Sequence, residues 1–363
     1  MRILQIITSL RAGGAEKLIV DMVPGYKKRG LDVDVLLFDG TDTPFKQQLE
    51  QQGVNVYCLG YGWVFNPILI LRLIPYLRRY DIVHTHNTAP QLFAAIGSLL
   101  CSVVLCTTEH TTTNRRRNLW WYAPIDKWMY SRYAKVISIS EATTEALRNY
   151  INIKTPVITI PNGIDIKKYT EANPLNRKAI GISDNAFLLM MVAGFRYQKD
   201  QDTIIRAITL LPDCIQLCLV GDGVRRKHCE ELAIGLGVQD RIAFTGMRTD
   251  IPNVLKMADV VVMSSHFEGF GLAAVEGMAA GKPVIASDVP GLKDIVQGYG
   301  LLFPSGNVEI LSTHILKLME DKAHYGKIAK QCQERAWDFD IQKMIEGYVG
   351  VYEELNDNNR GSK

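Results

Sequence analysis

Short runs of β-branched and other apolar residues alternate along the chain with segments in which apolar residues recur every three or four positions. Most of the short runs are apolar at successive positions, which is typical of parallel strands covered by helices on both faces. The predicted strands are Ile3–Thr8, Val33–Phe38, Val54–Cys58, Ile82–His86, Val103–Thr108, Lys135–Ser140, Val157–Ile160, Ala186–Val192, Ile215–Val220, Ile242–Thr245, Val260–Ser264 and Pro283–Ala286. This alternation predicts an α/β fold with doubly wound parallel sheets.

The pattern is interrupted once, by a stretch rich in Pro, Asn and Gly, "IPNGIDIKKYTEANPLNRKAIGIS" (Ile160–Ser183). A length of 363 residues favours about two domains. We therefore expect an N-terminal domain over residues 1–163 and a C-terminal domain over 164–340, with a final helix beginning at Ile341. The first predicted helix, Gly14–Arg29, contains the pair Pro24-Gly25, and we expect a bend there.

Composition narrows the class of protein. Hydrophobic residues make up 47% and charged residues 22%, and the net charge of +3 is too small to indicate a nucleic acid partner. The seven cysteines form no CxxC motif, which favours reduced thiols in the cytosol.

The longest apolar stretch, Leu92–Cys106, is too short to cross a bilayer, and "MRILQIITSL" fits a first strand better than a signal peptide. We expect a cytoplasmic chain, soluble or peripheral to a membrane.

Two sites in the first half could carry chemistry. Gly13 and Gly14 follow the first strand and open a helix, where backbone amides can approach a phosphate. The GxGxxG motif is absent, so a tight turn is the competing interpretation.

In "DIVHTHN" His84 and His86 face one side of a strand, and with His110 they could form a metal site. We favour polar strand ends at the carboxyl edge of the sheet, where ligands bind, and expect no metal.

In the second half, Arg196 and Lys199 lie between a strand and a helix, where two cations suit a diphosphate; solvated surface charge is the alternative. "SSHFEGFGLAAVEGMAAGKPVIASD" then places two glutamates in an apolar run, where unpaired carboxylates are costly. Glu268 falls in the turn after a strand, and Glu276 lies one turn inside the next helix, suited to a vicinal diol such as ribose. The amides of Phe270, Gly271 and Leu272 at the helix start fit an anion.

These residues resemble the signature of family-4 retaining glycosyltransferases with the GT-B fold, which has two glutamates separated by seven residues. The similarity continues through "GGAEK", "DIVHTHN", "EH", "IPNGID", "RYQKD", "VGDG", "FTG" and "EGFGLAAVEGMAAGKPVIASDVPGLKDIV", which together span nearly the whole chain. The resemblance implies two Rossmann-like domains facing a cleft, with the C-terminal helix (341–363) packing back onto the first domain. The first domain would bind the acceptor and the second a nucleotide-sugar donor.

Residue roles follow from the same resemblance. Glu276 would bind the ribose, Arg196 and Lys199 the diphosphate, and Glu268 with Phe270–Leu272 the sugar. Gly13, Gly14 and His110 would approach the donor from the first domain, and the base would contact the backbone at Gly246, Met247 and Arg248. Glu268, His110, Arg196 and Lys199 form the candidate catalytic set. Many members carry Arg where Gly194 stands, so the cation that meets the leaving phosphate is open.

The implied reaction is transfer of a sugar from a nucleotide-diphosphate sugar, UDP favoured over GDP, with retention at the anomeric carbon and without a metal or other cofactor. The acceptor would be a glycan or a polyprenyl-diphosphate-linked glycan of bacterial polysaccharide synthesis. No nucleophilic carboxylate is obvious, which favours a same-face mechanism in which the leaving phosphate takes the acceptor's proton. A nucleotide-sugar 2-epimerase and a non-catalytic binding scaffold are the alternatives.

Two stretches of the first half mix aromatic residues with cations, Trp63–Tyr80 and Asn114–Tyr133. This mixture suits a lipid headgroup region, and a core helix with a solvated basic edge is the alternative. We expect these stretches to contact an anionic membrane, on the cytoplasmic face of the inner membrane, or a lipid-linked acceptor. The residues expected to do so are Trp63, Arg115, Arg116, Arg117, Trp120 and Trp121.

Overall fold

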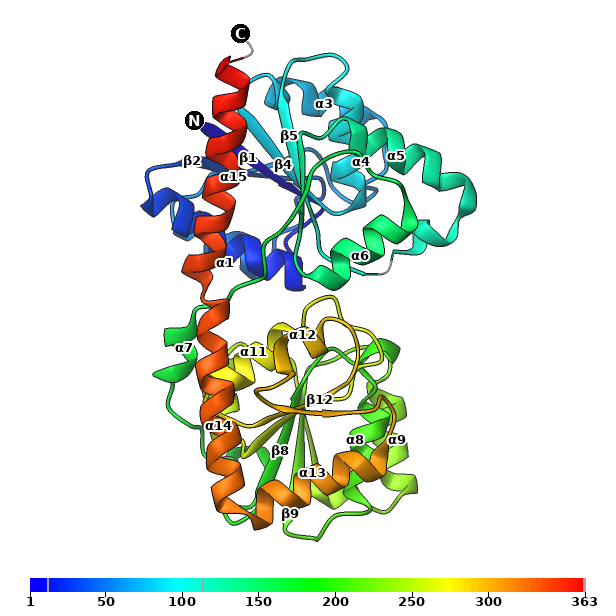
Figure 1. Cartoon of the computed structure of the whole chain (residues 1–363), viewed down its shortest axis with the longest axis vertical. Helices are drawn as coiled ribbons and strands as arrows, with labels where there is room; N and C mark the ends of the chain where they lie inside the picture. Colours follow the sequence, from blue (N-terminus) through cyan, green and yellow to red (C-terminus); the bar gives the residue numbers. More distant parts are fainter. Residues whose placement is uncertain (12, 113, 362–363) are drawn as a thin grey trace. The chain divides into compact units, whose positions relative to one another are not determined.

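The structure of the protein is a computed structural model that describes residues 1–361, except residues 12 and 113 and the side chains of residues 115 and 118. The chain forms two compact units: unit 1 comprises residues 1–163 and 341–363, and unit 2 comprises residues 164–340. Each unit is built on one parallel sheet with helices on both faces (Figure 1). The predicted fold class, two doubly wound α/β domains, is confirmed.

Unit 1 has a seven-stranded sheet in the order β3-β2-β1-β4-β5-β6-β7. Its strands are β1 (Arg2–Ile7), β2 (Asp32–Leu37), β3 (Val56–Cys58), β4 (Ile82–His86), β5 (Val104–Glu109), β6 (Lys135–Ser138) and β7 (Val157–Thr159). Its α-helices are α1 (Gly14–Lys28), α2 (Pro44–Gln51), α3 (Ile68–Leu77), α4 (Thr88–Gly97), α5 (Ala123–Ser131), α6 (Glu141–Tyr150) and α15 (Ile341–Gly361). The strand order reverses between β1 and β4, and the carboxyl ends of strands at such a switch point are where doubly wound sheets bind ligands.

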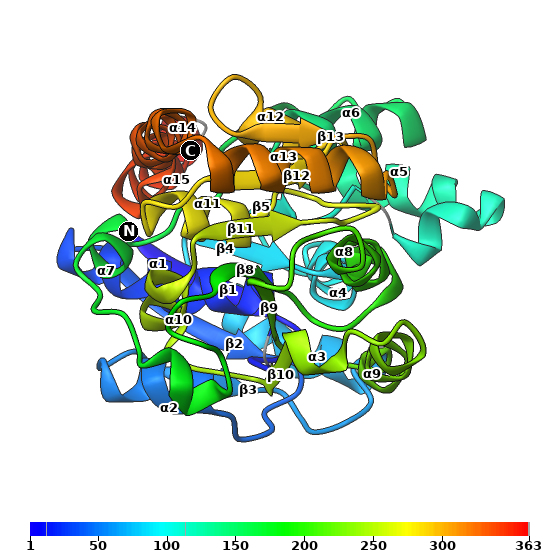
Figure 2. The same cartoon turned by 90° about the horizontal axis from the view of Figure 1, so that it is seen from below.

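Unit 2 has a six-stranded sheet in the order β10-β9-β8-β11-β12-β13, with its switch point between β8 and β11. Its strands are β8 (Phe187–Val192), β9 (Ile215–Val220), β10 (Ile242–Gly246), β11 (Val260–Met263), β12 (Val284–Ser287) and β13 (Leu301–Phe303). Its α-helices are α7 (Ile166–Thr170), α8 (Gln201–Ile208), α9 (Arg226–Gly235), α10 (Ile251–Met257), α11 (Leu272–Ala279), α12 (Leu292–Val296), α13 (Val308–Glu320) and α14 (Lys322–Ala336). Figure 2 shows α8 and α9 on one side of these strands and α10, α11 and α14 on the other.

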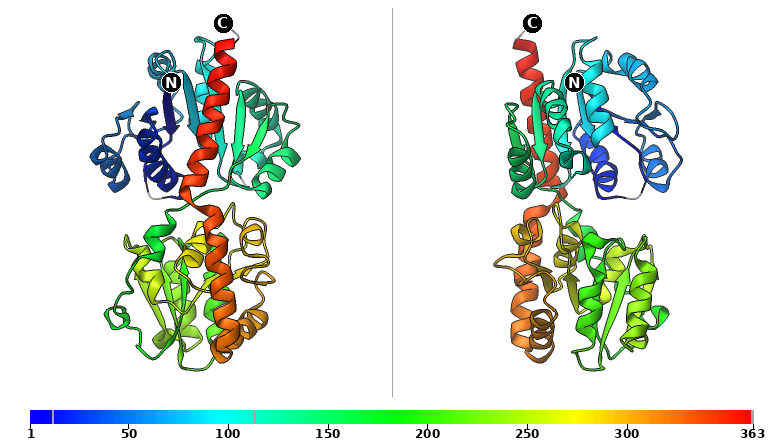
Figure 3. Two further views of the ribbon diagram at one scale, coloured as in Figure 1. Left: turned by 60° about the vertical axis from the view of Figure 1, so that its left-hand side comes forward. Right: turned by 90° about the vertical axis from the view of Figure 1, so that its right-hand side faces the viewer.

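The C-terminal helix α15 belongs to unit 1, where it lies beside α1 over the sheet (Figure 3). It buries residues spaced three or four apart, which form one helical stripe: Ile341, Met344, Ile345, Tyr348, Val351, Tyr352 and Leu355. Gly25 of α1 makes this packing possible, because a β-carbon there would lie 2.4 Å from Cδ1 of Ile345.

Two local features add to the sequence-based picture. Helix α1 runs from Gly14 to Lys28 with Pro24 inside it, so the proline does not end the helix, and the bend expected there stays a prediction. Packing of its buried face against the sheet and α15 outweighs the lost backbone hydrogen bond. Strand β13 was not predicted, because its three residues follow a turn rich in glycine and are too few to show a period.

Candidate functional site

In unit 2, Lys199 and Glu268 meet at the carboxyl edge of the sheet. A short 3-10 turn, Tyr197–Lys199, follows β8 and ends at Lys199. Glu268 lies between β11 and α11. These strands are neighbours, and the ammonium of Lys199 forms an ion pair with Oε2 of Glu268. The sequence named no protein partner for Glu268, and the structure supplies one, because adjacent strands place a lysine directly beside the carboxylate.

Arg196, three residues before Lys199, is an exposed cation. Among the residues that the structure describes, Arg196 forms no ion pair, in contrast to Lys199 three positions later. Its side chain folds back toward Gly194: Nε lies 4.0 Å from the position that a β-carbon at residue 194 would take. The Nε of Arg196 thus lies close to the position from which a side chain at residue 194 would extend.

The start of α11 brings backbone close to Glu268. Gly271 is the N-cap of α11, with a φ of 104° that residues with a β-carbon rarely adopt. A β-carbon there would also lie 2.6 Å from Leu292 and 3.5 Å from Cγ of Glu268. Phe270 is buried, and its ring packs edge-on against Phe339. The turn therefore holds Glu268 and the first residue of α11, Leu272, in a fixed arrangement.

Glu276 lies one turn further along α11 and has a protein partner. The hydroxyl of Tyr169, on the short helix α7, donates a hydrogen bond of 2.6 Å to Oε1 of Glu276. Tyr169 is buried against α11, so its hydroxyl has a fixed position. Tyr169 was not among the site residues predicted from the sequence. The only signal was a tyrosine in the segment after "IPNGID", which gave no indication of its target.

The expected base-binding residues lie at the end of β10. Gly246 closes this strand, and its carbonyl accepts a hydrogen bond of 2.9 Å from the amide of Gly221 after β9. Met247 is exposed, and Arg248 is held by Asp250, with Nε 2.8 Å from Oδ1. Because Arg248 is engaged by this carboxylate, its backbone is better placed than its side chain to contact a ligand.

In unit 1, His110 belongs to a buried chain of hydrogen bonds. His110 Nε2 lies 2.9 Å from His86 Nδ1, and His86 Nε2 lies 2.8 Å from Oε1 of Gln5. Gln5 donates from Nε2 to the hydroxyl of Tyr352, which lies 2.6 Å from Nδ1 of His84. The parallel register of β1, β4 and β5 places these side chains on one face of the sheet.

This chain fixes the tautomer of His110. The oxygen of Gln5 only accepts, so His86 carries its proton on Nε2 and accepts at Nδ1 from His110. His110 then carries its proton on Nε2, which leaves Nδ1 as an acceptor. Burial lowers the pKa of His110 to about 4 and that of His84 to about 3, and it holds the pKa of His86 well below its usual value. All three rings are neutral near pH 7.

The three histidines do not converge as metal ligands, because their facing nitrogens are engaged with one another, with Gln5 and with hydroxyl groups. In the described part of the chain, no group of three or more His, Cys, Asp or Glu residues is placed to hold a metal ion.

The glycines of the first loop, Gly13 and Gly14, are exposed at the start of α1, and Gly13 is its N-cap. The carboxylate of Glu16 folds back over them: Oε2 lies 2.2 Å from the place of a β-carbon on Gly13. Burial raises the pKa of Glu16, while hydrogen bonds from its own backbone amide and from the side chain of Asn87 act against this shift. Glu16 belongs to "GGAEK" but was not among the site residues predicted from the sequence.

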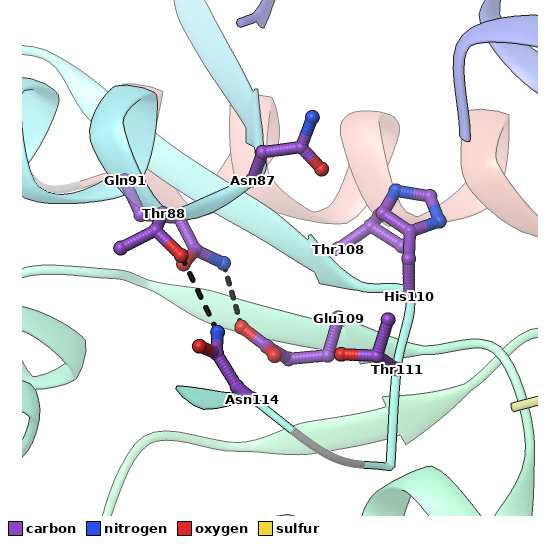
Figure 4. A pocket seen from close by; sticks show the side chains of 8 residues that line it. All are labelled: Asn87, Thr88, Gln91, Thr108, Glu109, His110, Thr111 and Asn114. Atoms are coloured by element: carbon purple, nitrogen blue, oxygen red, sulfur yellow. Dashed lines mark hydrogen bonds between the residues drawn. The ribbon is translucent and has the colours of Figure 1, made fainter. Parts of the chain in front are cut away.

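A polar hollow of about 320 Å³ lies next to His110, at the carboxyl ends of β4 and β5 (Figure 4). Its lining consists of Asn87, Thr88, Gln91, Thr108, Glu109, His110, Thr111 and Asn114. Of these only His110 was predicted as a site residue, because short polar side chains in loops carry no pattern of their own.

The aromatic and basic stretches of unit 1 divide into two groups. Trp63, Trp120 and Trp121 are exposed by 70%, 88% and 50%. Arg116 is only 6% exposed, and its Nε lies 3.0 Å from Oδ2 of the buried Asp126.

The side chain of Arg117 is only 8% exposed, with Nη2 3.0 Å from Oε2 of Glu109. The expectation that Arg116 and Arg117 face a membrane was therefore wrong, because two buried carboxylates draw them inward. The side chain of Arg115 lies outside the described residues. No helix in the described part of the chain has the length and apolar character needed to cross a bilayer.

Comparison with known proteins agrees with this architecture. Residues 12–168 match the family model described as Glycosyltransferase Family 4, and residues 173–337 match the one described as Glycosyl transferases group 1. An uncharacterized glycosyltransferase of Methanocaldococcus jannaschii is 29% identical over 304 residues, 76% of this chain and 77% of the relative. The UDP-Gal:alpha-D-GlcNAc-diphosphoundecaprenol alpha-1,3-galactosyltransferase of Escherichia coli is 26% identical over 293 residues, 76% of this chain and 75% of the relative.

Among solved structures, HepE of Anabaena in complex with UDP-glucose aligns with a TM-score of 0.86 and 25% identity, covering 98% of this chain and 100% of that one. The two family matches follow one another along almost the whole sequence, one on each unit. This protein therefore belongs to the family 4, group 1 glycosyltransferases with the GT-B fold.

Proposed function

We propose that this glycosyltransferase moves a sugar from a UDP-sugar to a hydroxyl group of a glycan or lipid-linked glycan, with retention at the anomeric carbon and without a metal ion. The observation that carries the proposal lies at the carboxyl edge of unit 2, where Lys199 pairs with Glu268 beside the start of α11 and the exposed Arg196 precedes Lys199 by three residues. This edge joins cations for a diphosphate to a carboxylate for sugar hydroxyls.

In the structure Lys199 and Glu268 pair with each other. When a donor binds, its diphosphate replaces Glu268 as the anionic partner of Lys199, and the sugar hydroxyls donate to the released carboxylate. Both groups exchange one partner for another, so neither is left buried and unpaired. Glu276, held by Tyr169, then accepts hydrogen bonds from the ribose hydroxyls.

Catalysis follows from where charge develops. Cleavage of the bond between sugar and phosphate leaves negative charge on the diphosphate and positive character on the anomeric carbon. Arg196 and Lys199 stabilise the leaving group, as fixed cations do in other transferases. The acceptor hydroxyl attacks from the face that the diphosphate leaves, and a phosphate oxygen takes its proton, so the configuration is retained.

The comparisons support UDP as the donor nucleotide. The name of the Escherichia coli relative specifies UDP-Gal, and the HepE structure contains UDP-glucose. The same relative acts on a diphosphoundecaprenol-linked sugar, which supports a lipid-linked acceptor.

The surface of unit 1 also favours such an acceptor at an anionic membrane on the cytoplasmic side. Between residues 51 and 140 the chain has three carboxylates, Asp81, Glu109 and Asp126, and the last two are buried. Among the described side chains of this region the exposed cations are Arg72, Arg78, Arg79, Lys127 and Arg132, in the same part of the sequence as the exposed tryptophans. Aromatic rings and cations without exposed carboxylates suit an anionic lipid surface.

The proposal is tested first by binding. Thermal unfolding is measured with UDP, GDP, ADP and their common sugar conjugates; a ligand at a hundred times its dissociation constant adds about 2.7 kcal/mol of stability. We expect stabilisation by UDP and one UDP-sugar. Glu276→Gln keeps the shape but loses the charge, and we expect it to weaken UDP binding by about 1.5–3 kcal/mol. Glu320→Gln, an exposed glutamate at the end of α13, is the matched control.

Turnover then separates the alternatives. With the stabilising UDP-sugar and an undecaprenyl-diphosphate-linked sugar, we expect UDP release and a product whose anomeric proton coupling matches that of the donor. An epimerase would release an altered sugar without acceptor, and a scaffold would bind without turnover. Inverted configuration, or no nucleotide binding at all, contradicts the proposal.

A further inference from the structure

The Lys199–Glu268 ion pair joins two turns at the carboxyl edge of unit 2. The β8 turn comprises residues 197–201, and the β11 turn comprises residues 264–268. The exchange of partners proposed above opens this ion pair when a donor binds. A fixed cation stabilises a developing charge only while its position is kept, so the two turns then need a link that the donor does not displace.

A second side-chain contact joins the same two turns. Asp200 directly follows Lys199 in the sequence, and His266 precedes Glu268 by two residues. Nε2 of His266 lies 3.6 Å from Oδ2 of Asp200, whose side chain is only 7% exposed. Because a carboxylate only accepts hydrogen bonds, the imidazole presents an N–H group to it whether the ring is neutral or charged.

His266 lies where the loops after three strands meet. Its Nδ1 is 3.1 Å from the hydroxyl of Ser305, in the loop after β13. Its backbone amide donates to the carbonyl of Gln198 in the β8 turn at 2.9 Å. The hydroxyl of Ser264 donates to the carbonyl of Asp200 at 2.7 Å. Backbone and side-chain contacts therefore hold the β11 turn to its neighbours.

The backbone of Asp200 indicates that its side chain is used. Its φ of 47° and ψ of 56° lie in the left-handed region, which glycine adopts at less cost than any residue with a β-carbon. The carboxylate there is buried, and it accepts a hydrogen bond of 2.5 Å from the hydroxyl of Thr203. Burial raises the pKa of Asp200, while the bond from Thr203 and the charge of His266 act against this shift. Burying a carboxylate is costly unless it has partners, and here the partners belong to α8 and to the β11 turn.

We propose that Asp200 and His266 are positioning residues for sugar transfer, which hold Lys199 and Glu268 in place after the donor has separated their ion pair. They act through these two residues and do not contact the donor. The inference rests on the proposed transferase function and adds two residues to it.

The proposed role predicts an effect on kcat more than on donor binding. Charge on the leaving diphosphate is greatest in the transition state, so the stabilisation by Lys199 depends on its exact position at that point. A displacement of about 1 Å can slow a reaction about a hundredfold. Binding of the ground-state donor, which is spread over many contacts, changes less.

Three variants probe the link. His266→Ala removes it, whereas His266→Gln keeps an N–H donor near the position of Nε2 and serves as the conservative variant. Asp200→Gly removes the carboxylate from a backbone that suits glycine, so the lost contacts are opposed by a relieved backbone. The matched control is His228→Ala, because Nε2 of His228 lies 2.7 Å from Oδ2 of Asp202 in another His–Asp pair of unit 2, between α9 and α8.

The first measurement is release of UDP from the stabilising UDP-sugar by the full chain with acceptor. We expect His266→Ala and Asp200→Gly to lower kcat about tenfold to a hundredfold, with KM for the donor within about threefold of wild type. His266→Gln should recover most of the lost kcat, and His228→Ala should react as wild type does.

The second measurement needs no ligand. Lys199→Met cannot form the ion pair, so in this background the His266–Asp200 contact is the remaining side-chain link between the two turns among the described contacts. Hydrogen exchange, followed by mass spectrometry, is compared in wild type, His266→Ala, Lys199→Met and the double variant. We expect exchange of residues 197–201 and 264–268 to rise more in the double variant than the two single changes together predict.

Three results would overturn the inference: an unchanged kcat in His266→Ala and Asp200→Gly, a loss in His266→Gln as large as in His266→Ala, or strictly additive effects on exchange. If wild type neither binds UDP nor releases it from a UDP-sugar, the proposed function is wrong, and the exchange measurement still decides whether the link exists. Should His266→Ala fail to fold, judged by circular dichroism, Asp200→Gly takes its place in both measurements.

Discussion

Tyr169 sets the orientation of the carboxylate that is proposed to bind ribose. A hydrogen bond of 2.6 Å from its hydroxyl to Oε1 of Glu276 restricts the rotation of that side chain. A carboxylate fixed before the ligand arrives loses less side-chain entropy on binding. Tyr169 is thus a positioning residue that acts through Glu276 without contacting the donor.

We expect Tyr169→Phe to weaken UDP binding by about 0.5–1.5 kcal/mol, the usual contribution of one hydrogen bond. Because the effect passes through the ribose contact, it should be smaller with 2′-deoxy-UDP. Titration calorimetry with both nucleotides measures the difference. Tyr325→Phe is the matched control, since Tyr325 donates to the backbone oxygen of Asp259 at 2.9 Å elsewhere in unit 2. Equal losses with both nucleotides would show that Tyr169 only stabilises the fold.

The sequence predicted where Glu268 and Glu276 lie in the fold, but not which side chains bond to them. The spacing of Glu268 and Glu276, and their place after a strand, put both at the carboxyl edge of unit 2, where they lie. Their partners come from far along the chain: Lys199 is 69 residues from Glu268, and Tyr169 is 107 residues from Glu276. Such pairs depend on which elements pack together, and no local pattern records that choice.

At the scale of elements, the segment from His110 to Tyr122 connects the hollow to the surface. Its first residues line the hollow, and two short 3-10 turns (Arg115–Asn118 and Trp120–Tyr122) follow. Arg116 and Arg117 anchor it to the interior, while Trp120 and Trp121 end it in solvent. Three consecutive arginines gave no periodicity from which to tell which point inward, so the sequence alone assigned Arg116 and Arg117 wrongly to the surface.

Membrane binding is therefore expected to depend on the tryptophans. We predict that the chain sediments with vesicles rich in phosphatidylglycerol, less so at high salt, because cations and aromatic rings act together. Replacing Trp120 and Trp121 by Ser should reduce this binding. Trp337→Ser, which changes an exposed tryptophan of unit 2, should not.

Arg116→Met should behave differently from the tryptophan variants. It leaves Asp126 buried without its cation, and we expect a loss of about 3–5 kcal/mol of stability.

For the tryptophan variants, vesicle binding that survives replacement of both Trp120 and Trp121 would rule out this surface as the membrane contact.

At the scale of the whole molecule, the alternation of patterns predicted two parallel-sheet domains, and the structure has them. What the pattern could not predict is how the ends of the chain meet. Gln5 of the first strand donates to Tyr352 of the last helix across 347 residues at 2.8 Å, inside unit 1. This bond joins α15 to the histidines that end at His110. The last helix thus supports the hydrogen-bonded histidines of β4 and β5, which lie in the first third of the sequence.

The neutral histidines make unit 1 sensitive to acid. Burial lowers the pKa of His110 to about 4 and of His84 to about 3, so the unfolded chain, with ordinary histidines near 6.5, binds more protons at mildly acidic pH. Stability contributed by these groups is complete above pH about 6.5 and falls as the pH drops toward the folded-state values. Each such histidine removes about 1.4 kcal/mol per pH unit within that window.

We therefore predict that the free energy of unfolding of unit 1 decreases steadily between pH 6.5 and pH 5, above the range in which ordinary aspartates titrate. Urea unfolding followed by tryptophan fluorescence measures this, because four of the five tryptophans, all except Trp337, lie in unit 1. His86→Gln keeps a donor and an acceptor in the chain but cannot be protonated, so it should reduce the pH slope by about one third. A wild-type stability that is constant over this range, or a slope unchanged in the variant, would mean that the histidines are not held neutral by the fold.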